Sequence, residues 1–156
     1  MAALFGLFWL TGKGTPLADR SEALATAQKQ VRAVAADAGI GISGRYNPSA
    51  SYEACGRRGV PAPAGGQFTL TYTAYADLPD RMHIAALRRL RSALERQDGV
   101  KVTAYEERPQ VQEAQLDADG PDRLHIPLHI AVASAKPPHT VRLAVTTDCL
   151  QPPTGR

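Results

Sequence analysis

The order of hydrophobic and polar positions along the chain predicts two amphipathic helices. Over 19–38, apolar residues recur at steps of three and four, which is typical of a helix. Asp19 and Glu22 have the spacing of a capping box, and Gly39 predicts the end of this helix. A second helix is expected from about Asp80 to Gln97, because its apolar residues fall on one stripe: Ile84, Leu87, Leu90 and Leu94.

Other segments alternate apolar and polar residues with the period of a β-strand. The clearest runs from Gln67 to Ala76, and the others are the short Ile40–Ile42 stretch, Val100–Tyr105, Arg123–Ala133 and Val141–Cys149. Gln115 to Gly120 is expected to form a turn. Strands with one apolar face indicate an antiparallel sheet covered on one side by helices. We therefore expect a two-layer α+β sandwich, with both helices on one face of about five strands in the order α-β-β-α-β-β-β.

The 156 residues fit one domain. We expect it to span 19–150, preceded by a hydrophobic segment and spacer over 1–18 and followed by a flexible tail over 151–156. A long irregular stretch from Gly44 to Gly66 interrupts the pattern. Loops of this length are usually functional or tethered.

Met1 to Leu10 is uncharged and apolar. It is too short to cross a bilayer as a helix, which needs about 20 residues, and it lacks the positive residues that begin a signal peptide. Three interpretations stay open: the end of a longer membrane anchor, an uncleaved short signal, or a segment docked on the domain. The anchor is favoured, so we expect membrane association through these residues.

Two cysteines, Cys55 and Cys149, lie far apart and form no Cys-x-x-Cys motif. They are either two unrelated buried thiols or a disulfide that ties the long loop to the end of the last strand. In the chain-entropy model such a disulfide would stabilise the fold by roughly 4–5 kcal/mol. Because it would persist only in an oxidising compartment, this favoured alternative predicts an extracytoplasmic protein.

The net charge of +3 is too small to indicate nucleic-acid binding. Four arginines are expected opposite the leucines of the second helix: Arg81, Arg88, Arg89 and Arg96. The ordinary interpretation is a solvated basic face. The alternative is contact with an anionic surface, such as lipid headgroups or a wall polymer.

A second candidate surface is the polar face of the expected sheet, which would carry Thr69, Thr71, Thr73, Tyr75, His125 and His129. It is either ordinary solvated surface or a face that binds a partner or ligand. The two histidines, four residues apart on one strand, would be separated by about 13 Å. That distance is too long for both to bind one metal ion.

No motif for catalysis, a metal or a cofactor stands out. Glu106 and Glu107 are adjacent in a strand and should point to opposite faces. The cluster of Asp117, Asp119 and Asp122 lacks the glutamate that closes a calcium loop. Gly56-Arg57-Arg58-Gly59 has no P-loop ending; it could bind an anion, although a solvated loop is favoured.

Three segments carry a family resemblance: Ser51–Cys55, Phe68–Tyr72 and Thr146–Cys149. With the order of elements, they resemble a broad group of small exported proteins and lipoproteins of actinobacteria. The resemblance implies that the two cysteines pair and that the N-terminus is a lipobox or membrane anchor. The chain lacks a lipobox cysteine, and the resemblance implies no activity.

The sequence favours a non-enzymatic, membrane-tethered or secreted domain that acts at the cell envelope through contacts with a protein or an envelope component. One alternative is a small enzyme whose site is assembled around the Gly44–Gly66 loop. Another is a cytoplasmic accessory or binding protein with free thiols. No cofactor, metal or nucleic-acid partner is expected.

Overall fold

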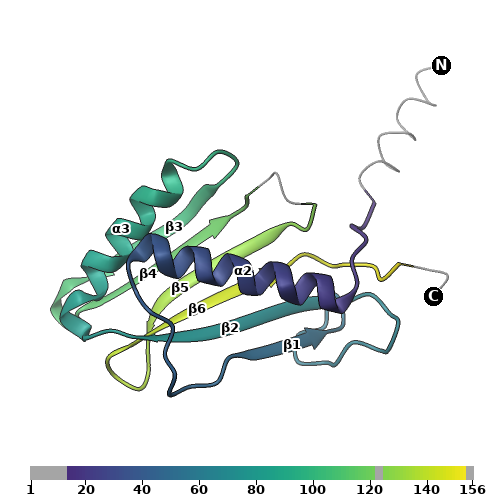
Figure 1. Cartoon of the computed structure of the whole chain (residues 1–156), viewed down its shortest axis with the longest axis horizontal. Coiled ribbons are helices and arrows are strands. Elements are labelled where there is room, and N and C mark those ends of the chain that lie inside the picture. Colours follow the sequence, from purple (N-terminus) through teal and green to yellow (C-terminus); the bar gives the residue numbers. More distant parts are fainter. Residues whose placement is uncertain (1–13, 122–124, 154–156) are drawn as a thin grey trace.

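The computed structural model describes residues 14–121 and 125–153, which are built around one antiparallel sheet (Figure 1). Its strands follow the order β1-β2-β6-β5-β4-β3, so the last strand lies at the centre and pairs with β2 on one side and β5 on the other. The strands are β1 (Ser49–Glu53), β2 (Thr69–Asp77), β3 (Lys101–Arg108), β4 (Glu113–Asp119), β5 (Leu128–Ala135) and β6 (Thr140–Thr147).

Two helices cover one face of this sheet. α2 (Arg20–Ala38) packs against β2 and β6, whereas α3 (His83–Glu95) packs against β3 and β4. A short 3-10 turn, η1 (Asp80–Met82), leads into α3, and another, η2 (Pro109–Val111), joins β3 to β4. Figure 1 shows both helices crossing the same side of the strands. The predicted α+β class with helices on one face is confirmed.

The core lies between the helices and the sheet. α3 buries large side chains there, among them Leu87, Leu90 and Leu94. Four of the six buried residues of α2 are alanine, for example Ala23 and Ala27, so this helix can approach the strands closely. Full burial of each leucine contributes about 1.5–3 kcal/mol relative to its exposure to water.

The predicted limits of the first helix are confirmed by its caps. Asp19 accepts a hydrogen bond from the backbone N–H of Glu22 at 2.7 Å. Gly39 ends the helix in the left-handed conformation, with a φ of 72°, which a residue without a side chain adopts without strain. Arg89 of α3 donates a hydrogen bond to the carbonyl of Ala38 at 3.0 Å, so the second helix helps to cap the first.

The predicted first strand, Ile40–Ile42, is wrong. Ile42 makes only an isolated bridge to Ala76 and is exposed. The first strand is instead β1, inside the stretch expected to be irregular. Its sequence, SASYE, has few apolar residues because it is an edge strand, so hydrophobic alternation did not reveal it.

The sheet also has one strand more than expected, because the predicted turn at Gln115–Gly120 belongs largely to β4. Its inward side chains are Ala114, Leu116 and Ala118, and the four residues that alternate with them are polar, three of them acidic. Aspartate is depleted in strands and alanine is a weak apolar signal, so the segment resembled a turn. Pairing with β3 and β5 on both sides makes it a strand.

The two ends of the described chain meet beside the sheet. Leu17 forms a parallel bridge with Gln151, whose backbone N–H donates to the carbonyl of Pro16 at 2.9 Å. The Met1–Leu10 segment lies outside the described residues. Within the described part, neither helix has the length and apolar character needed to span a membrane.

Candidate functional site

The sheet face opposite the helices, called here the open face, carries small and polar side chains. Cross-strand pairing aligns one residue from each of the six strands in a continuous line. We call this line the polar row; from β1 to β3 it consists of Ser51, Thr71, Thr146, His129, Asp119 and Lys101. None of its members is buried. The open face therefore presents hydroxyl groups toward β1 and charged groups toward β3.

At the charged end, His129 lies between two carboxylates. Its Nδ1 is 2.6 Å from Asp119 Oδ1, and its Nε2 is 2.5 Å from Asp148 Oδ1. The hydrogen bond to Asp148 raises the pKa of His129, and that to Asp119 adds to the effect, whereas partial burial opposes it. Only the protonated ring can donate from both nitrogens, so this arrangement stabilises the imidazolium form.

At the hydroxyl end, the open face adjoins a pocket of about 550 Å³. The Oγ1 atoms of Thr71 and Thr146 lie 3.3 Å apart in it and share one hydrogen bond. We call it the cysteine-loop pocket, because a loop beside Cys55 forms one wall. Its lining residues are Glu53, Ala54, Gly56, Arg57, Arg58, Thr69, Thr71 and Thr146.

The favoured disulfide between Cys55 and Cys149 is confirmed, with 94 residues of sequence separation. It joins the loop that follows β1 to the segment that follows β6. The loop is also bonded to itself: Ala54 N–H donates to the Val60 carbonyl at 2.8 Å, and Arg57 N–H donates to the Ala54 carbonyl at 3.0 Å. Glu53 accepts a hydrogen bond from the Gly59 N–H. The wall of the pocket is thus held by covalent and hydrogen bonds.

Most residues of the predicted polar face do lie together. Thr69, Thr71, Thr73 and Tyr75 alternate with the buried side chains of β2, and His129 lies on the same face of β5. Sequence analysis missed the residues that complete the polar row on the other strands. Periodicity assigns a side chain to a face, but only strand order decides which side chains become neighbours.

The placement of His125 on this face is wrong. It precedes β5, and its Nε2 forms an ion pair with Glu22 at the start of α2, at 2.8 Å. The strand begins at Leu128, just after Pro127, which has no N–H to donate to a sheet. The expected alternation therefore does not extend back to His125.

The arginines of the second helix do not form one free surface. Arg88 donates two hydrogen bonds to Glu107 on β3, at 2.6 and 2.7 Å, and Arg89 caps α2. Arg81 and Arg96 are exposed, and neither forms an ion pair with another residue of the described ranges. Contact of the second helix with an anionic surface stays a prediction, and it now depends on Arg81 and Arg96.

Glu107 is part of a small cluster between α3 and β3. The hydrogen bonds from Arg88, followed by that from Tyr105, lower the pKa of Glu107 to about 2. Burial and the hydrogen bond to Glu107 raise the pKa of Tyr105 to about 12. The adjacent Glu106 instead pairs with Arg108 at 2.9 Å, so the two glutamates point to opposite faces as predicted.

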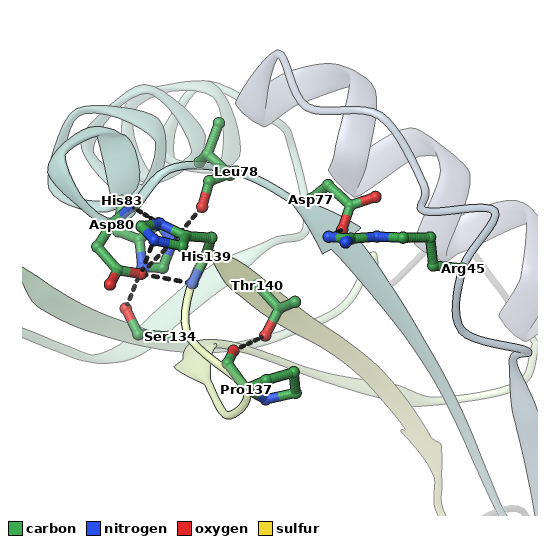
Figure 2. A network of polar contacts seen from close by, with 9 residues as sticks. All are labelled: Arg45, Asp77, Leu78, Asp80, His83, Ser134, Pro137, His139 and Thr140. Atoms are coloured by element: carbon green, nitrogen blue, oxygen red, sulfur yellow. Dashed lines mark hydrogen bonds and ion pairs between the residues drawn. The ribbon is translucent and has the colours of Figure 1, made fainter.

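A second polar network lies at the opposite end of the sheet, where η1 meets the hairpin between β5 and β6 (Figure 2). His83 is 1% exposed. Its Nδ1 is 2.8 Å from the Ser134 hydroxyl, and its Nε2 is 2.8 Å from the Leu78 carbonyl. The hairpin is held as well, since His139 N–H donates to Asp80 at 2.8 Å. Ser134 and Asp80 lie 51 and 59 residues along the chain from the histidines that they bond in these two contacts, so sequence spacing does not reveal these pairs.

This network places a serine next to a histidine, which is also the arrangement of a catalytic nucleophile and its base. A carbonyl only accepts, so His83 Nε2 carries a proton, and in the neutral ring Nδ1 then accepts from the Ser134 hydroxyl. The Ser134 oxygen in turn accepts from the Ala114 N–H at 3.1 Å. In a catalytic triad a carboxylate holds the second nitrogen of the histidine, whereas His83 Nε2 bonds to the Leu78 carbonyl, and Asp80 Oδ1 lies farther away at 3.5 Å. The network therefore joins α3, β4 and the hairpin as a structural connection.

The described residues contain no group of three or more histidines, cysteines or acidic residues placed to hold a metal ion. No protein-family model matches this chain, and no similar curated protein or solved structure was found. The resemblance to exported actinobacterial proteins accordingly stays a prediction. The site is defined by its own geometry: a polar row across the sheet and a disulfide-held pocket at its hydroxyl end.

Proposed function

We propose that this chain is a membrane-tethered or secreted cell-envelope domain, without catalytic activity, that binds a protein or an envelope component through its open face. The observation that carries the proposal is the polar row with its adjoining pocket. Both helices cover the other face, so substitutions on the open face are free of the constraints of core packing. A surface of small hydroxylated residues beside a fixed loop suits recognition of polar groups.

The disulfide supports the extracytoplasmic location in this proposal. A bond that closes a loop of 94 residues is consistent with an oxidising environment, because thiols in the cytoplasm are kept reduced. The alternative of a cytoplasmic protein with free thiols conflicts with it, since the described residues include no free cysteine.

Binding is favoured over catalysis by the chemistry of the pocket. Its position in the Gly44–Gly66 stretch is the one observation that favours the alternative of an enzyme. However, its lining has no histidine; the hydroxyls of Thr71 and Thr146 bond to each other, and that of Thr69 bonds to the Cys55 sulfur, so none of them bonds to a base. His129, one strand away, has both ring nitrogens engaged by carboxylates. Nucleophilic catalysis needs a nucleophile beside a free base.

The test is site-specific photo-crosslinking in the native host. A photoreactive residue replaces Thr73, on the open face, or Ala85, an exposed position of α3 that serves as the matched control. We expect a discrete adduct with an envelope component from Thr73 only. Equal adducts from both positions, or none from Thr73, would contradict the proposal.

The extracytoplasmic location is tested on the same samples by mass spectrometry. Trapping thiols with an alkylating reagent before lysis should leave the protein unmodified, and alkylation after reduction should add two groups, one for each cysteine. Alkylation without reduction would show free thiols and would exclude the extracytoplasmic assignment.

A further inference from the structure

The cysteine-loop pocket is rich in hydrogen-bond donors. Arg57 and Arg58 line it, and the guanidinium group of an arginine has five N–H donors and no acceptor. Neither guanidinium forms an ion pair with any residue that the structure describes. Thr71 and Thr146 add hydroxyls; because they share one hydrogen bond, the hydrogen of the accepting hydroxyl stays available.

The two acidic residues near the pocket each already accept a hydrogen bond within the domain. Glu53, the acidic residue of the lining, accepts a hydrogen bond from the Gly59 N–H in the same loop. Asp148 is next to the disulfide and is held by His129 at 2.5 Å. Two arginines against one glutamate leave the lining with a net positive charge. A ligand rich in acceptors and negatively charged would complement it.

The pocket is also fixed before any ligand arrives. The disulfide and the hydrogen bonds within the loop hold the backbone of Arg57 and Arg58 beside the threonines. Gly56 and Gly59, with φ values of 74° and 80°, provide the left-handed turns that the loop requires. Binding then costs little ordering of the backbone, which favours affinity.

We propose that the cysteine-loop pocket binds a compact oxyanion, a carboxylate or a phosphate, carried by a small hydroxylated ligand. Arg57 and Arg58 supply charge-assisted hydrogen bonds to the anionic group, and Thr69, Thr71 and Thr146 bond to its hydroxyls. The volume of about 550 Å³ lies within the usual range of small-molecule sites, about 300–1,000 Å³. This inference rests on the proposed function, because it treats the open face as a binding surface.

The experiment is an amide-proton NMR titration of the oxidised full chain. The probes are glucuronate for a carboxylate, glycerol phosphate and inorganic phosphate for a phosphate, and glucose as the uncharged control. We expect shifts confined to the cysteine loop and to β1, β2 and β6 with at least one anion, and none with glucose. Comparison of the anions identifies which oxyanion is preferred.

Variants locate the site. Arg57→Gln with Arg58→Gln should weaken binding at least about tenfold, since a hydrogen bond to a charged group contributes about 1.5–3 kcal/mol. Thr71→Val should weaken it less. The matched control, Lys29→Gln with Arg32→Gln, removes the same charge from exposed positions of α2 and should leave binding unchanged. All these side chains are unburied, and the dispersion of each spectrum shows whether the variant is folded.

Three results would overturn the proposal: no shift with any anion, equal shifts with glucose, or anion binding that survives the arginine substitutions. The last would show a diffuse response to the net charge of the chain. The proposed function fails separately. If Thr73 still crosslinks to a discrete partner while no anion binds, the open face is a binding surface and the pocket is not an oxyanion site.

Discussion

The two faces of the sheet differ in what their side chains contact. On the covered face, leucine, isoleucine and valine side chains are buried against the helices, and even the polar His83 is fully bonded within the domain. On the open face, the central positions are threonine and alanine, and the charged residues are about half exposed. The same strands provide both faces, because successive side chains alternate.

This difference means that the covered face determines the stability of the fold, whereas the open face can vary with what it binds. Residues of the covered face are constrained by close packing, so their loss should destabilise the fold. Residues of the open face have few packing partners, and their arrangement in a polar row is not required to fill a core. The disulfide is the exception. It lies at the edge of the open face, yet it stabilises the fold by joining the loop after β1 to the segment after β6.

Removal of the disulfide should have the largest effect. Cys55→Ser with Cys149→Ser is expected to lower the free energy of unfolding by about 4–5 kcal/mol, from the chain entropy of a long closed loop. Urea unfolding of the variant and the oxidised protein measures the difference. A loss below about 1 kcal/mol would contradict the expected stabilisation of the fold by this bond.

Truncation in the core of the covered face comes next. Leu87→Ala should cost about 2–5 kcal/mol, because it removes buried surface and leaves a cavity. The matched change on the open face, Thr73→Ala, should stay within about 0.5 kcal/mol, as is usual for surface positions. The midpoints of denaturant unfolding measure both losses when the slope of the unfolding free energy against denaturant concentration is unchanged. Similar losses at the two positions would show that a partner or segment covers the open face.

The hydrogen-bond network of the buried His83 predicts a smaller loss of stability on the covered face. His83→Leu keeps a side chain of similar size but leaves the Leu78 carbonyl without its donor, so we expect destabilisation by about 1–3 kcal/mol. Thermal unfolding is the measurement. No change in stability would argue that the pair of hydrogen bonds to His83 contributes nothing net.

The smallest effect should depend on pH. Because the folded-state pKa of His129 is raised above its unfolded value, its stabilisation is complete below the unfolded value of about 6.5 and is lost as pH rises through the folded pKa. His129→Gln should therefore cost about 0.5–1 kcal/mol near pH 6, as exposed ion pairs do, and less toward pH 9. Unfolding at both pH values measures this. A cost that grows with pH would contradict the assignment.

The elements that the sequence predicted correctly are those with strong local signals. The limits of α2 follow from Asp19 and Gly39, which act within one turn of the chain. The stripe of α3 and the alternation of β2 each specify a buried face by themselves. The two missed strands, β1 and β4, have weak local signals, since their inward positions are largely small residues. Their conformation depends on partners distant in the sequence.

The candidate site could be predicted only in part, for the same reason. Alternation in β2 was sufficient to place Thr69, Thr71, Thr73 and Tyr75 on one face. It could not bring Thr146 beside Thr71, which lies on a strand 75 residues earlier. Nor could it place Asp119 and Asp148 on either side of His129, because that depends on the order and register of three strands.

The sequence by itself determined the fold class and the alternation that gives each strand one apolar and one polar face. These are consequences of local periodicity, which the backbone geometry of helices and strands imposes residue by residue. Only the tertiary structure decided the strand order, the polar row and the pocket formed where Cys55 meets Cys149. Such juxtapositions result from contacts between distant segments, whose free energies depend on the whole packed domain and not on any one stretch of the chain.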